Sequence, residues 1–177
     1  MKNTPNLLDL YEAIKPKYII FCDMDGVLVD FDKGYNNLTG KPTNHNDVQD
    51  KNEFWRTLNN SLKDKNITEY EYWVNLPWMS DGMILWNYIK KFTPYILTAP
   101  SRDPGSKQGK IEWANRLDGM KNIYFKPAYA KAEYSKKNRI LIDDKSSTIE
   151  QWNQRGGIGI LHTSTTNTIK QLQQLEL

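Results

Sequence analysis

The sequence contains one cysteine and two histidines among its 177 residues, and this scarcity excludes several kinds of site. A single cysteine cannot form a disulfide within the chain, and Cys22 lies inside an apolar run, where a thiol is usually buried and unreactive. His45 and His162 lie far apart, and neither has a cysteine or a second histidine at ligand spacing. The sequence therefore argues against an internal disulfide and against a zinc site.

Long apolar segments are also lacking. No stretch is long enough to span a membrane, and the N-terminus lacks the apolar core of a signal peptide. We therefore expect a cytoplasmic protein without a membrane partner. The net charge of +3 is too small to indicate binding to a nucleic-acid polymer. The length suits one domain with a sizeable insertion, and it leaves the oligomeric state open.

Apolar residues are few, but many of them are large. Hydrophobic residues make up 38% of the sequence and aromatic residues 12%, so we expect a core of fewer and larger side chains. Positive charge is concentrated in residues 102–145, which hold eleven Lys or Arg against six Asp or Glu. This excess favours an anionic substrate near that region, although an ordinary solvated surface explains it equally well.

The most informative stretch is residues 18–27, in which five consecutive apolar residues end in two carboxylates and a glycine. An apolar run bounded by polar residues predicts a strand buried on both faces, as in a parallel sheet. Asp23 and Asp25 follow this strand at its carboxyl end, where ligands of open α/β sheets bind. Gly26 favours a break from extended geometry, which would let both carboxylates face one point. Two close negative charges need a cation or a shared proton, and oxygen ligands suit Mg²⁺.

Two other interpretations of Asp23 and Asp25 are open at this point. Asp-x-Asp-Gly is part of a calcium-binding loop, but that loop needs a third oxygen ligand before its glycine, and here a strand precedes it instead of a helix. A plain turn with two solvated carboxylates is the simpler alternative. The other predicted strands weigh against this plain turn.

The remainder of the chain alternates strands and helices. Two capping-box patterns, Thr68 with Glu71 and Ser147 with Glu150, predict helix starts. Alternating strands and helices predict an α/β fold with a doubly wound parallel sheet. Apolar runs predict further strands at 95–98, 123–125, 139–142 and 157–161. Helical periodicity predicts helices over 6–15, 30–40, 54–62, 68–76, 81–92, 103–117, 147–156 and from 167 onward.

Polar residues end three of the predicted strands. Asp23 and Asp25 follow the first, Thr98 ends the second, and Asp143 and Asp144 follow a later one. Because parallel strands bring their carboxyl ends to one edge of the sheet, this edge would hold four carboxylates and a hydroxyl, with lysines nearby. Carboxylates hold Mg²⁺, whereas hydroxyl, ammonium and amide groups hold phosphoryl oxygens. The sequence therefore predicts a magnesium site that faces a phosphate.

These polar residues occur in the order of the motifs of a known family. The four motifs of the haloacid dehalogenase-like (HAD) phosphatases are similar to Asp23-Met24-Asp25-Gly26-Val27, Leu97-Thr98, a lysine in the basic stretch, and Ile142-Asp143-Asp144. The resemblance covers residues 18–161 and implies a Rossmann-like HAD core. The segments D-M-D-G-V-L-V-D-F, L-T-A-P-S and L-I-D-D-K further resemble the 5′(3′)-deoxyribonucleotidases. That family usually has Thr-Ser-Pro where this chain has Thr98-Ala99-Pro100.

The resemblance implies a role for each of these residues. Asp23 would be the nucleophile that forms an aspartyl-phosphate, and Asp25 would act first as general acid and then as general base. Mg²⁺ would be held by Asp23, the backbone carbonyl of Asp25, and Asp143 with help from Asp144. Thr98 and a lysine would neutralise the charge of the transferring phosphoryl group.

The identity of that lysine is open. Lys131 precedes the last acidic pair by twelve residues, close to the spacing of the family, and Lys126 is the alternative. Lys107 is a candidate for a second phosphate contact, although a solvated helix residue is an equally good interpretation. Two residues inside the motifs, Met24 and Ala99, are further candidates for substrate binding.

The spacing of the motifs predicts an insertion. Asp25 and Thr98 are 73 positions apart, far more than one crossover helix requires. We therefore expect residues 31–80 to form a small helical cap inserted after the first strand, with residues 1–30 and 81–177 forming the core domain. Such caps close over a site, exclude water and select the leaving group.

The predicted cap is rich in aromatic residues. These side chains would either stack on a nucleobase or form the cap's own small core. Trp73 and Trp78, near the point where the cap returns to the sheet, are the candidates for the substrate pocket.

The leading functional hypothesis is a magnesium-dependent phosphomonoesterase that acts on nucleoside monophosphates, as the nucleotidase resemblance implies. A HAD phosphatase for a sugar phosphate or another small metabolite is the alternative within the same chemistry. A catalytically silent HAD-fold binding protein is a third hypothesis. Silent members would be expected to lack one of the motif carboxylates, and none is missing here.

Overall fold

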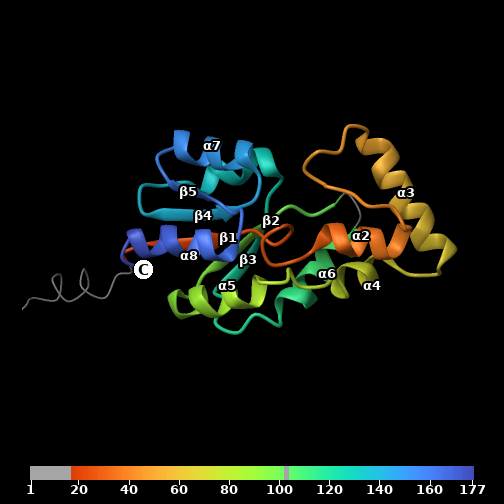
Figure 1. Cartoon of the computed structure of the whole chain (residues 1–177), viewed down its shortest axis with the longest axis horizontal. Coiled ribbons are helices and arrows are strands. Elements are labelled where there is room, and N and C mark those ends of the chain that lie inside the picture. Colours follow the sequence, from red (N-terminus) through yellow and green to blue (C-terminus); the bar gives the residue numbers. More distant parts are fainter. Residues whose placement is uncertain (1–16, 102–103) are drawn as a thin grey trace, which may run out of the picture.

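The computed structural model describes residues 17–101 and 104–177 of the chain (Figure 1). The helix predicted over residues 6–15 lies outside these ranges, and so does Asp103, the predicted start of another helix. Within the described ranges, helices and strands alternate along the chain. None of the helices described there combines the length and the apolar character needed to cross a membrane.

The five strands in the described part of the chain form one parallel sheet with the order β3-β2-β1-β4-β5. Their bounds are Ile19–Cys22 (β1), Tyr95–Thr98 (β2), Asn122–Phe125 (β3), Arg139–Asp143 (β4) and Ile158–Leu161 (β5). Strands are added outward from β1 first in one direction and then in the other, which creates a topological switch point between β1 and β4. The prediction of a doubly wound parallel sheet is confirmed.

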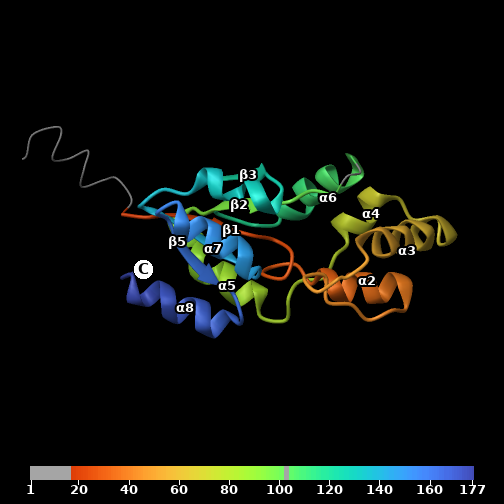
Figure 2. The same cartoon turned by 90° about the horizontal axis from the view of Figure 1, so that it is seen from above.

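Helices cover both faces of this sheet. One face packs against α5 (Gly82–Ile89), α6 (Pro104–Ala114) and α8 (Thr165–Gln174), and the other packs against α7 (Ser146–Gln154) and the 3₁₀ helix η2 (Ala128–Tyr134). Figure 2 shows α5 and α8 side by side. Right-handed crossovers explain why the helices lie on two faces of the sheet, because connections that run in opposite directions from its centre place their helices on opposite faces.

The side chains of β1 alternate between two hydrophobic clusters, one on each face of the sheet. Ile20 and Cys22 belong to the larger cluster together with Trp86 of α5, whereas Phe21 belongs to the smaller one together with Trp152 of α7. This alternation is the two-residue period of a strand, and burial on both faces explains the uninterrupted apolar run. Cys22 is fully buried, and this burial raises the pKa of its thiol.

Residues 31–80 form three helices beyond the carboxyl ends of the strands, next to α6 (Figures 1 and 2). These helices are α2 (Phe31–Thr39), α3 (Lys51–Asp64) and α4 (Glu69–Val74). The predicted capping box at the start of α4 is confirmed, because Thr68 and Glu71 each accept a hydrogen bond from the other's backbone N–H. Helices α4 and α6 pack closely at Gly109, where a Cβ atom would lie 2.6 Å from the Cβ atom of Trp73.

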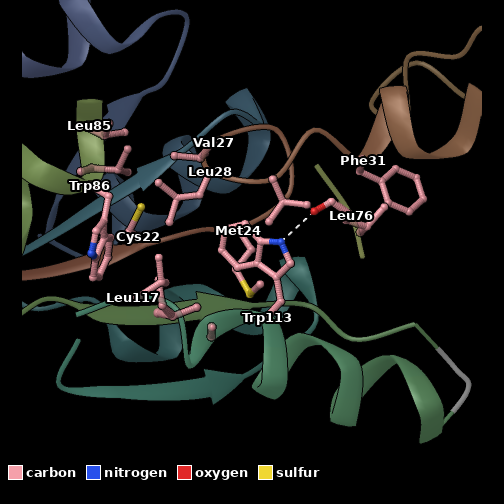
Figure 3. Close-up of a cluster of buried hydrophobic side chains, with 14 of the residues drawn as sticks. Cys22, Met24, Val27, Leu28, Phe31, Leu76, Leu85, Trp86, Trp113 and Leu117 are labelled. Atoms are coloured by element: carbon pink, nitrogen blue, oxygen red, sulfur yellow. Dashed lines mark hydrogen bonds between the residues drawn. The ribbon is translucent and has the colours of Figure 1, made fainter. Parts of the chain in front are cut away.

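One hydrophobic cluster connects these three helices with the sheet. Met24, Phe31 and Leu76 belong to it, and so does Trp113 of α6 (Figure 3). The indole N–H of Trp113 donates to the backbone carbonyl of Leu76 at 2.9 Å, which ties the end of the helical segment to α6. The segment 31–80 is therefore packed onto the sheet domain as well as joined to it by the chain.

The predicted capping box at the start of α7 is wrong. Helix α7 begins at Ser146, and its N-cap residue Lys145 makes no side-chain capping hydrogen bond, so neither Ser147 nor Glu150 occupies the expected position. The backbone N–H of Lys145 instead donates to Oδ1 of Asp143 at 3.0 Å. The helix follows β4 so closely that the end of the strand, and not a local cap, sets its first residue.

Several other helix ends differ from the predictions: α3 begins at Lys51, three residues earlier than predicted, and α6 ends at Ala114, three residues earlier. Helix α5 ends at Ile89 and is continued by a 3₁₀ helix, η1 (Lys90–Phe92). Helix α8 begins at Thr165, two residues earlier than predicted, because the Ser164 hydroxyl accepts a hydrogen bond from the N–H of Asn167 and caps the helix. These differences concern single turns and leave the order of elements unchanged.

Candidate active site

The chain turns sharply after β1, at the point where the two carboxylates lie. The backbone N–H of Val29 donates to the carbonyl of Met24 at 2.8 Å and closes the turn. Gly26 has a φ angle of +75°, a left-handed conformation that glycine adopts without steric strain. The predicted break from extended geometry is confirmed, and both Asp23 and Asp25 line the same cavity.

Three carboxylates converge beside this turn. Carboxylate oxygens of Asp23, Asp143 and Asp144 lie within 4.8 Å of one another. Asp23 follows β1 and Asp143 ends β4, and these two strands pair directly. The cluster therefore lies at the switch point of the sheet, where the strand ends were predicted to bring it.

Lys131 of η2 supplies a positive charge within this cluster. Its Nζ lies 2.7 Å from Oδ2 of Asp23 and 2.7 Å from Oδ2 of Asp143. Burial by itself would lower the pKa of Lys131, but the two carboxylates outweigh it and leave the pKa raised. Of the two lysines left open by the sequence, the structure brings Lys131 to the aspartates, whereas Lys126 pairs with Glu133 at 2.7 Å.

The carboxylates of the cluster carry more negative charge than Lys131 neutralises. Burial, followed by the charge of Asp23, raises the pKa of Asp144 to about 6, and the same two causes raise the pKa of Asp143. A divalent cation would relieve this repulsion, and oxygen donors are the ligands that Mg²⁺ prefers. Gly26 completes the site, because a Cβ atom there would lie 2.0 Å from Oδ2 of Asp144. The absence of a side chain at Gly26 lets Asp144 approach, and the donor set of three converging carboxylates fits a magnesium ion.

A second buried lysine, Lys110 of α6, lies beside Asp25. Its ammonium forms an ion pair with Oδ2 of Asp25 and donates a hydrogen bond to Oγ1 of Thr98 at 3.1 Å. The same Nζ lies 4.7 Å from the ring centre of Trp73, and the residue is only 1% exposed. Lys110 thereby links Thr98 at the end of β2 to the carboxylates that follow β1.

The sequence analysis missed Lys110, although the sequence carries a signal for it. Lys110 precedes Trp113 by three residues and Leu117 by seven, so it lies on the apolar face of its helix. A lysine on a buried face needs a partner for its charge. That partner is in a different element, and no local pattern identifies it.

A cavity of about 300 Å³ opens onto the carboxylates. Four aromatic residues from the segment 31–80 form one side of it, and we call them the aromatic wall: Phe31, Phe54, Trp55 and Trp73. Trp73 therefore lies where the sequence analysis expected it. Trp78 does not line the cavity, and that expectation is corrected. Its ring packs 4.6 Å from the ring of Trp113, because the backbone at Trp78 pairs with Val29 and directs the side chain into the hydrophobic cluster.

The remaining candidates for substrate binding fall in different places. Ala99 lines the cavity. The side chain of Met24 is buried in the hydrophobic cluster (Figure 3), and its backbone N–H donates to Oδ1 of Asp23 at 2.8 Å. Lys107 is exposed and lies over the ring of Phe125, at 5.3 Å, outside the cavity. The interpretation of Lys107 as a solvated helix residue therefore agrees with the structure.

The loop of residues 41–50, between α2 and α3, returns to the acidic cluster. The side-chain amide of Asn46 donates to Oδ2 of Asp144 at 2.7 Å, and Nε2 of His45 lies 3.7 Å from the same atom. Nδ1 of His45 lies 3.2 Å from Asp32. Burial by itself would lower the pKa of His45, but Asp32 and Asp144 outweigh it and raise the pKa. No local pattern in the sequence indicated that this loop reaches the site.

Comparison with protein-family models and with curated protein sequences gives no match. Solved structures do match. A hydrolase from Streptococcus pneumoniae TIGR4 aligns over 89% of this chain and 100% of its own, with 14% identity and a TM-score of 0.53. A haloacid dehalogenase-like family protein from Streptococcus pneumoniae aligns over 86% of this chain and 90% of its own, with 16% identity and a TM-score of 0.51.

A HAD-hydrolase from Bacillus subtilis, bound to magnesium, aligns over 82% of this chain and 86% of its own, with 14% identity and a TM-score of 0.52. At these identities the similarity establishes the fold. It agrees with the parallel sheet and with its helices on both faces. This chain therefore has the Rossmann-like α/β core of the HAD hydrolases.

Proposed function

We propose that this protein is a magnesium-dependent phosphomonoesterase that works through an aspartyl-phosphate intermediate. The observation that carries the proposal is the convergence of Asp23, Asp25, Lys131 and the pair Asp143–Asp144 at one cavity. Phosphoryl transfer needs a nucleophile, a proton donor and positive charge for the phosphoryl oxygens, and this set contains all three. The HAD fold and the resemblance of the four motifs support the same chemistry.

In the first step, Asp23 is the nucleophile. The N–H of Met24 and the ammonium of Lys131 hold its two carboxylate oxygens, and so fix the side chain for attack on phosphorus. As the new bond forms, the bond between phosphorus and the leaving oxygen breaks. A proton passes from Asp25 to that oxygen, which leaves as an alcohol. Thr98 and Lys131 stabilise the charge on the phosphoryl oxygens.

In the second step, water releases the phosphate. The water gives its proton back to Asp25, and its oxygen forms a bond to phosphorus. The bond between phosphorus and Asp23 breaks, which yields inorganic phosphate and the free carboxylate. Asp25 therefore serves as acid and as base in one cycle, and no other proton carrier is required.

The metal ion would be held by Asp23, Asp143 and Asp144, with the backbone carbonyl of Asp25 as a further ligand. When bound, it would supply positive charge that reduces the repulsion between the nucleophile and the phosphate. The fit of the donor set and the magnesium in the Bacillus subtilis neighbour support this choice of ion. Removal of divalent cations with a chelator should therefore abolish turnover, and added Mg²⁺ should restore it.

We further propose that residues 31–80 act as a cap over the site, with residues 1–30 and 81–177 as the core domain. The aromatic wall of the cavity comes from this segment, and Asn46 from the same segment contacts Asp144. Covering the site in this way would exclude water from the transferring phosphoryl group. The cap would also choose the leaving group, because it forms the part of the cavity away from the metal site.

The proposed substrate is a nucleoside monophosphate. Its phosphate would bind at Lys131, and its base would stack on the aromatic wall, where Trp55 remains 36% exposed. Stacking on aromatic rings is the usual way in which proteins hold bases without reading their sequence. The cavity of about 300 Å³ is within the size range of small-molecule sites.

Phosphate release from a panel of monophosphates in the presence of Mg²⁺ tests these proposals. We expect 5′ and 3′ nucleoside monophosphates to give higher kcat/KM values than sugar phosphates. Equal values for the two classes would contradict the choice of substrate while leaving the phosphatase chemistry intact. Release from no member of the panel would contradict the catalytic proposal and would favour a silent binding protein.

A further inference from the structure

Lys110 is a buried cation beside the proposed general acid, and the mechanism above gives it no role. It is 1% exposed, and it does not line the cavity, whereas Lys131 does. Lys131 is therefore placed to meet a phosphate, whereas Lys110 is placed to act on groups of the protein itself.

The chemistry of an ammonium group fixes what Lys110 does to its two polar partners. An ammonium can only donate hydrogen bonds. Oγ1 of Thr98 must therefore accept from Lys110, which holds the ammonium at the end of β2. In the same way, the ion pair occupies Oδ2 of Asp25.

The other oxygen of Asp25 has no such contact. Oδ1 of Asp25 is buried and has no hydrogen-bond partner among residues 17–101 and 104–177. Asp25 as a whole lines the cavity. With Oδ2 held by Lys110, Oδ1 is the oxygen available to carry the proton that the leaving group needs.

We propose that Lys110 is a positioning residue that orients Asp25 for proton transfer. In the first step the proton on Oδ1 of Asp25 moves to the leaving oxygen. That oxygen keeps the electron pair of its broken bond to phosphorus, and becomes the hydroxyl of the alcohol. Asp25 is then a carboxylate, paired with the ammonium of Lys110. This inference rests on the proposed phosphomonoesterase function.

Lys110 is held in place from its other side by Trp73. Its Nζ lies 4.7 Å from the centre of the indole, a distance at which a cation and a ring attract each other. Gly109 allows α4 and α6 to approach closely at this point. The packing of these two helices therefore fixes the position of the ammonium relative to Asp25.

Two substrates with different leaving groups test the proposal. A nucleoside 5′-monophosphate has an alcohol leaving group that needs a proton, whereas p-nitrophenyl phosphate has one that leaves without it. The quantity to compare is kcat/KM, because it reports formation of the aspartyl-phosphate and excludes its hydrolysis. The variants are Lys110→Met, Lys110→Arg, and a matched control, Lys137→Met, at an exposed lysine that does not line the cavity.

We expect Lys110→Met to lower kcat/KM for the nucleotide by about 100-fold, as loss of a general acid does, but to lower it only a few-fold for p-nitrophenyl phosphate. Lys110→Arg should recover part of the kcat/KM that Lys110→Met loses on the nucleotide. Lys137→Met should leave kcat/KM unchanged on both substrates. An equal loss on both substrates, or no loss on either, would overturn the inference.

A double-variant cycle keeps the proposal testable if Lys110→Met does not fold, because Lys110→Met combined with Asp25→Asn leaves no unpaired buried charge. The double variant should show the same ratio of kcat/KM values for the two substrates as Asp25→Asn alone, and the same absolute values within a few-fold. A further large loss common to both substrates would place Lys110 on the phosphate and overturn the inference. Wild-type protein that hydrolyses neither substrate would overturn the proposed function, and this inference with it.

Discussion

The two ends of the cavity are built in different ways. At the sheet edge, the functional groups come from strand ends and from the turn after β1, and the pairing of β1 with β4 sets the positions of Asp23 and Asp143. The aromatic wall comes from α2, α3 and α4, whose positions depend on the packing of large side chains against one another. Strand pairing thus determines the chemistry of the site, and helix packing determines the shape of its far end.

The two ends also differ in their electrostatics. Buried charges at the sheet edge need partners at short distance, and the structure supplies them through Lys131 and Lys110. The rings of the aromatic wall need only contact, such as the stacking of Phe31 on Trp73 at 5.3 Å. Changes at the sheet edge should therefore affect catalysis by orders of magnitude, whereas changes in the wall should affect mainly binding.

The replacement Asp23→Asn gives the largest effect that this comparison predicts. The variant lacks the nucleophile, so kcat should fall by about 10⁴-fold or more. The fold should survive, since asparagine has nearly the same volume. Phosphate release measures the activity and circular dichroism measures the fold. Turnover at the native rate would show that the attacking group lies elsewhere.

The replacement Gly26→Ala should weaken magnesium binding by about 10- to 100-fold, as changes in groups around metal ligands do. The added Cβ atom would lie 2.0 Å from Oδ2 of Asp144 and displace this ligand. Isothermal titration calorimetry with Mg²⁺ measures the effect.

Gly40→Ala is the matched control for Gly26→Ala. Gly40 has a similar φ angle, +71° against +75°, but nothing lies within 4 Å of the position of its Cβ atom. Both variants should lose about 1–2 kcal/mol of unfolding free energy from backbone strain. Weakened magnesium binding in both would mean that strain, and not the contact with Asp144, is the cause.

The replacement Trp55→Ala tests the aromatic wall. Trp55 lines the cavity and is 36% exposed, so its loss should leave the fold intact. Loss of one stacking contact should raise KM for nucleoside monophosphates by about 10-fold and leave kcat nearly unchanged. Steady-state kinetics measure both constants.

Tyr129→Ala is the matched control for Trp55→Ala, because Tyr129 is 79% exposed and does not line the cavity. It should leave KM unchanged. If Trp55→Ala lowered kcat as strongly as a change at the sheet edge, the assignment of catalysis to the sheet edge and of binding to the aromatic wall would be wrong.

The smallest predicted effect is a pH dependence of magnesium binding. Asp144 must lose its proton to act as a ligand, and its pKa is raised to about 6, first by burial and then by the charge of Asp23. Protons therefore compete with the cation below about pH 6, and the apparent affinity for Mg²⁺ should fall by up to about tenfold per pH unit as the pH decreases. The affinity should level off at higher pH, once Asp144 and also Asp143, whose pKa is raised by the same two causes, have lost their protons.

Calorimetric titrations at pH 5, 6, 7 and 8 measure this dependence. The variant Asp144→Asn should bind Mg²⁺ more weakly, but with a flatter dependence on pH, because one of the two titrating ligands is absent and only Asp143 remains. An affinity that stays constant between pH 5 and pH 7 in the unaltered protein would contradict the assignment of Asp144 as a ligand.

Local patterns predicted the residues whose positions depend on a single strand or turn. The apolar run before Asp23 indicated a strand buried on both faces, and Gly26 indicated the turn that follows. The prediction of a capping box at Thr68 and Glu71 was correct because the chain before α4 is extended and leaves the first turn of α4 exposed. The pattern of Ser147 with Glu150 failed because the end of β4 already fixes the start of α7.

Residues whose positions depend on contacts between elements were harder to predict. Lys110 and Asn46 reach the site from segments that are distant in sequence, and nothing in their neighbours indicates the partner. Trp73 and Trp78 are five residues apart, yet one lines the cavity and the other packs on Trp113. Which of two neighbouring indoles faces a cavity depends on how the whole segment packs, and a single sequence does not contain that information in local form.

The sequence by itself determined the doubly wound sheet and the residues at its carboxyl edge, because the alternation of apolar runs and the polar residues that end them are properties of consecutive positions. The tertiary structure decided which lysine meets the nucleophile, which lysine pairs with Asp25 and which aromatic rings border the cavity. These choices depend on burial and charge pairing between distant segments, where the free energy of a contact is set by its surroundings and not by the order of residues along the chain.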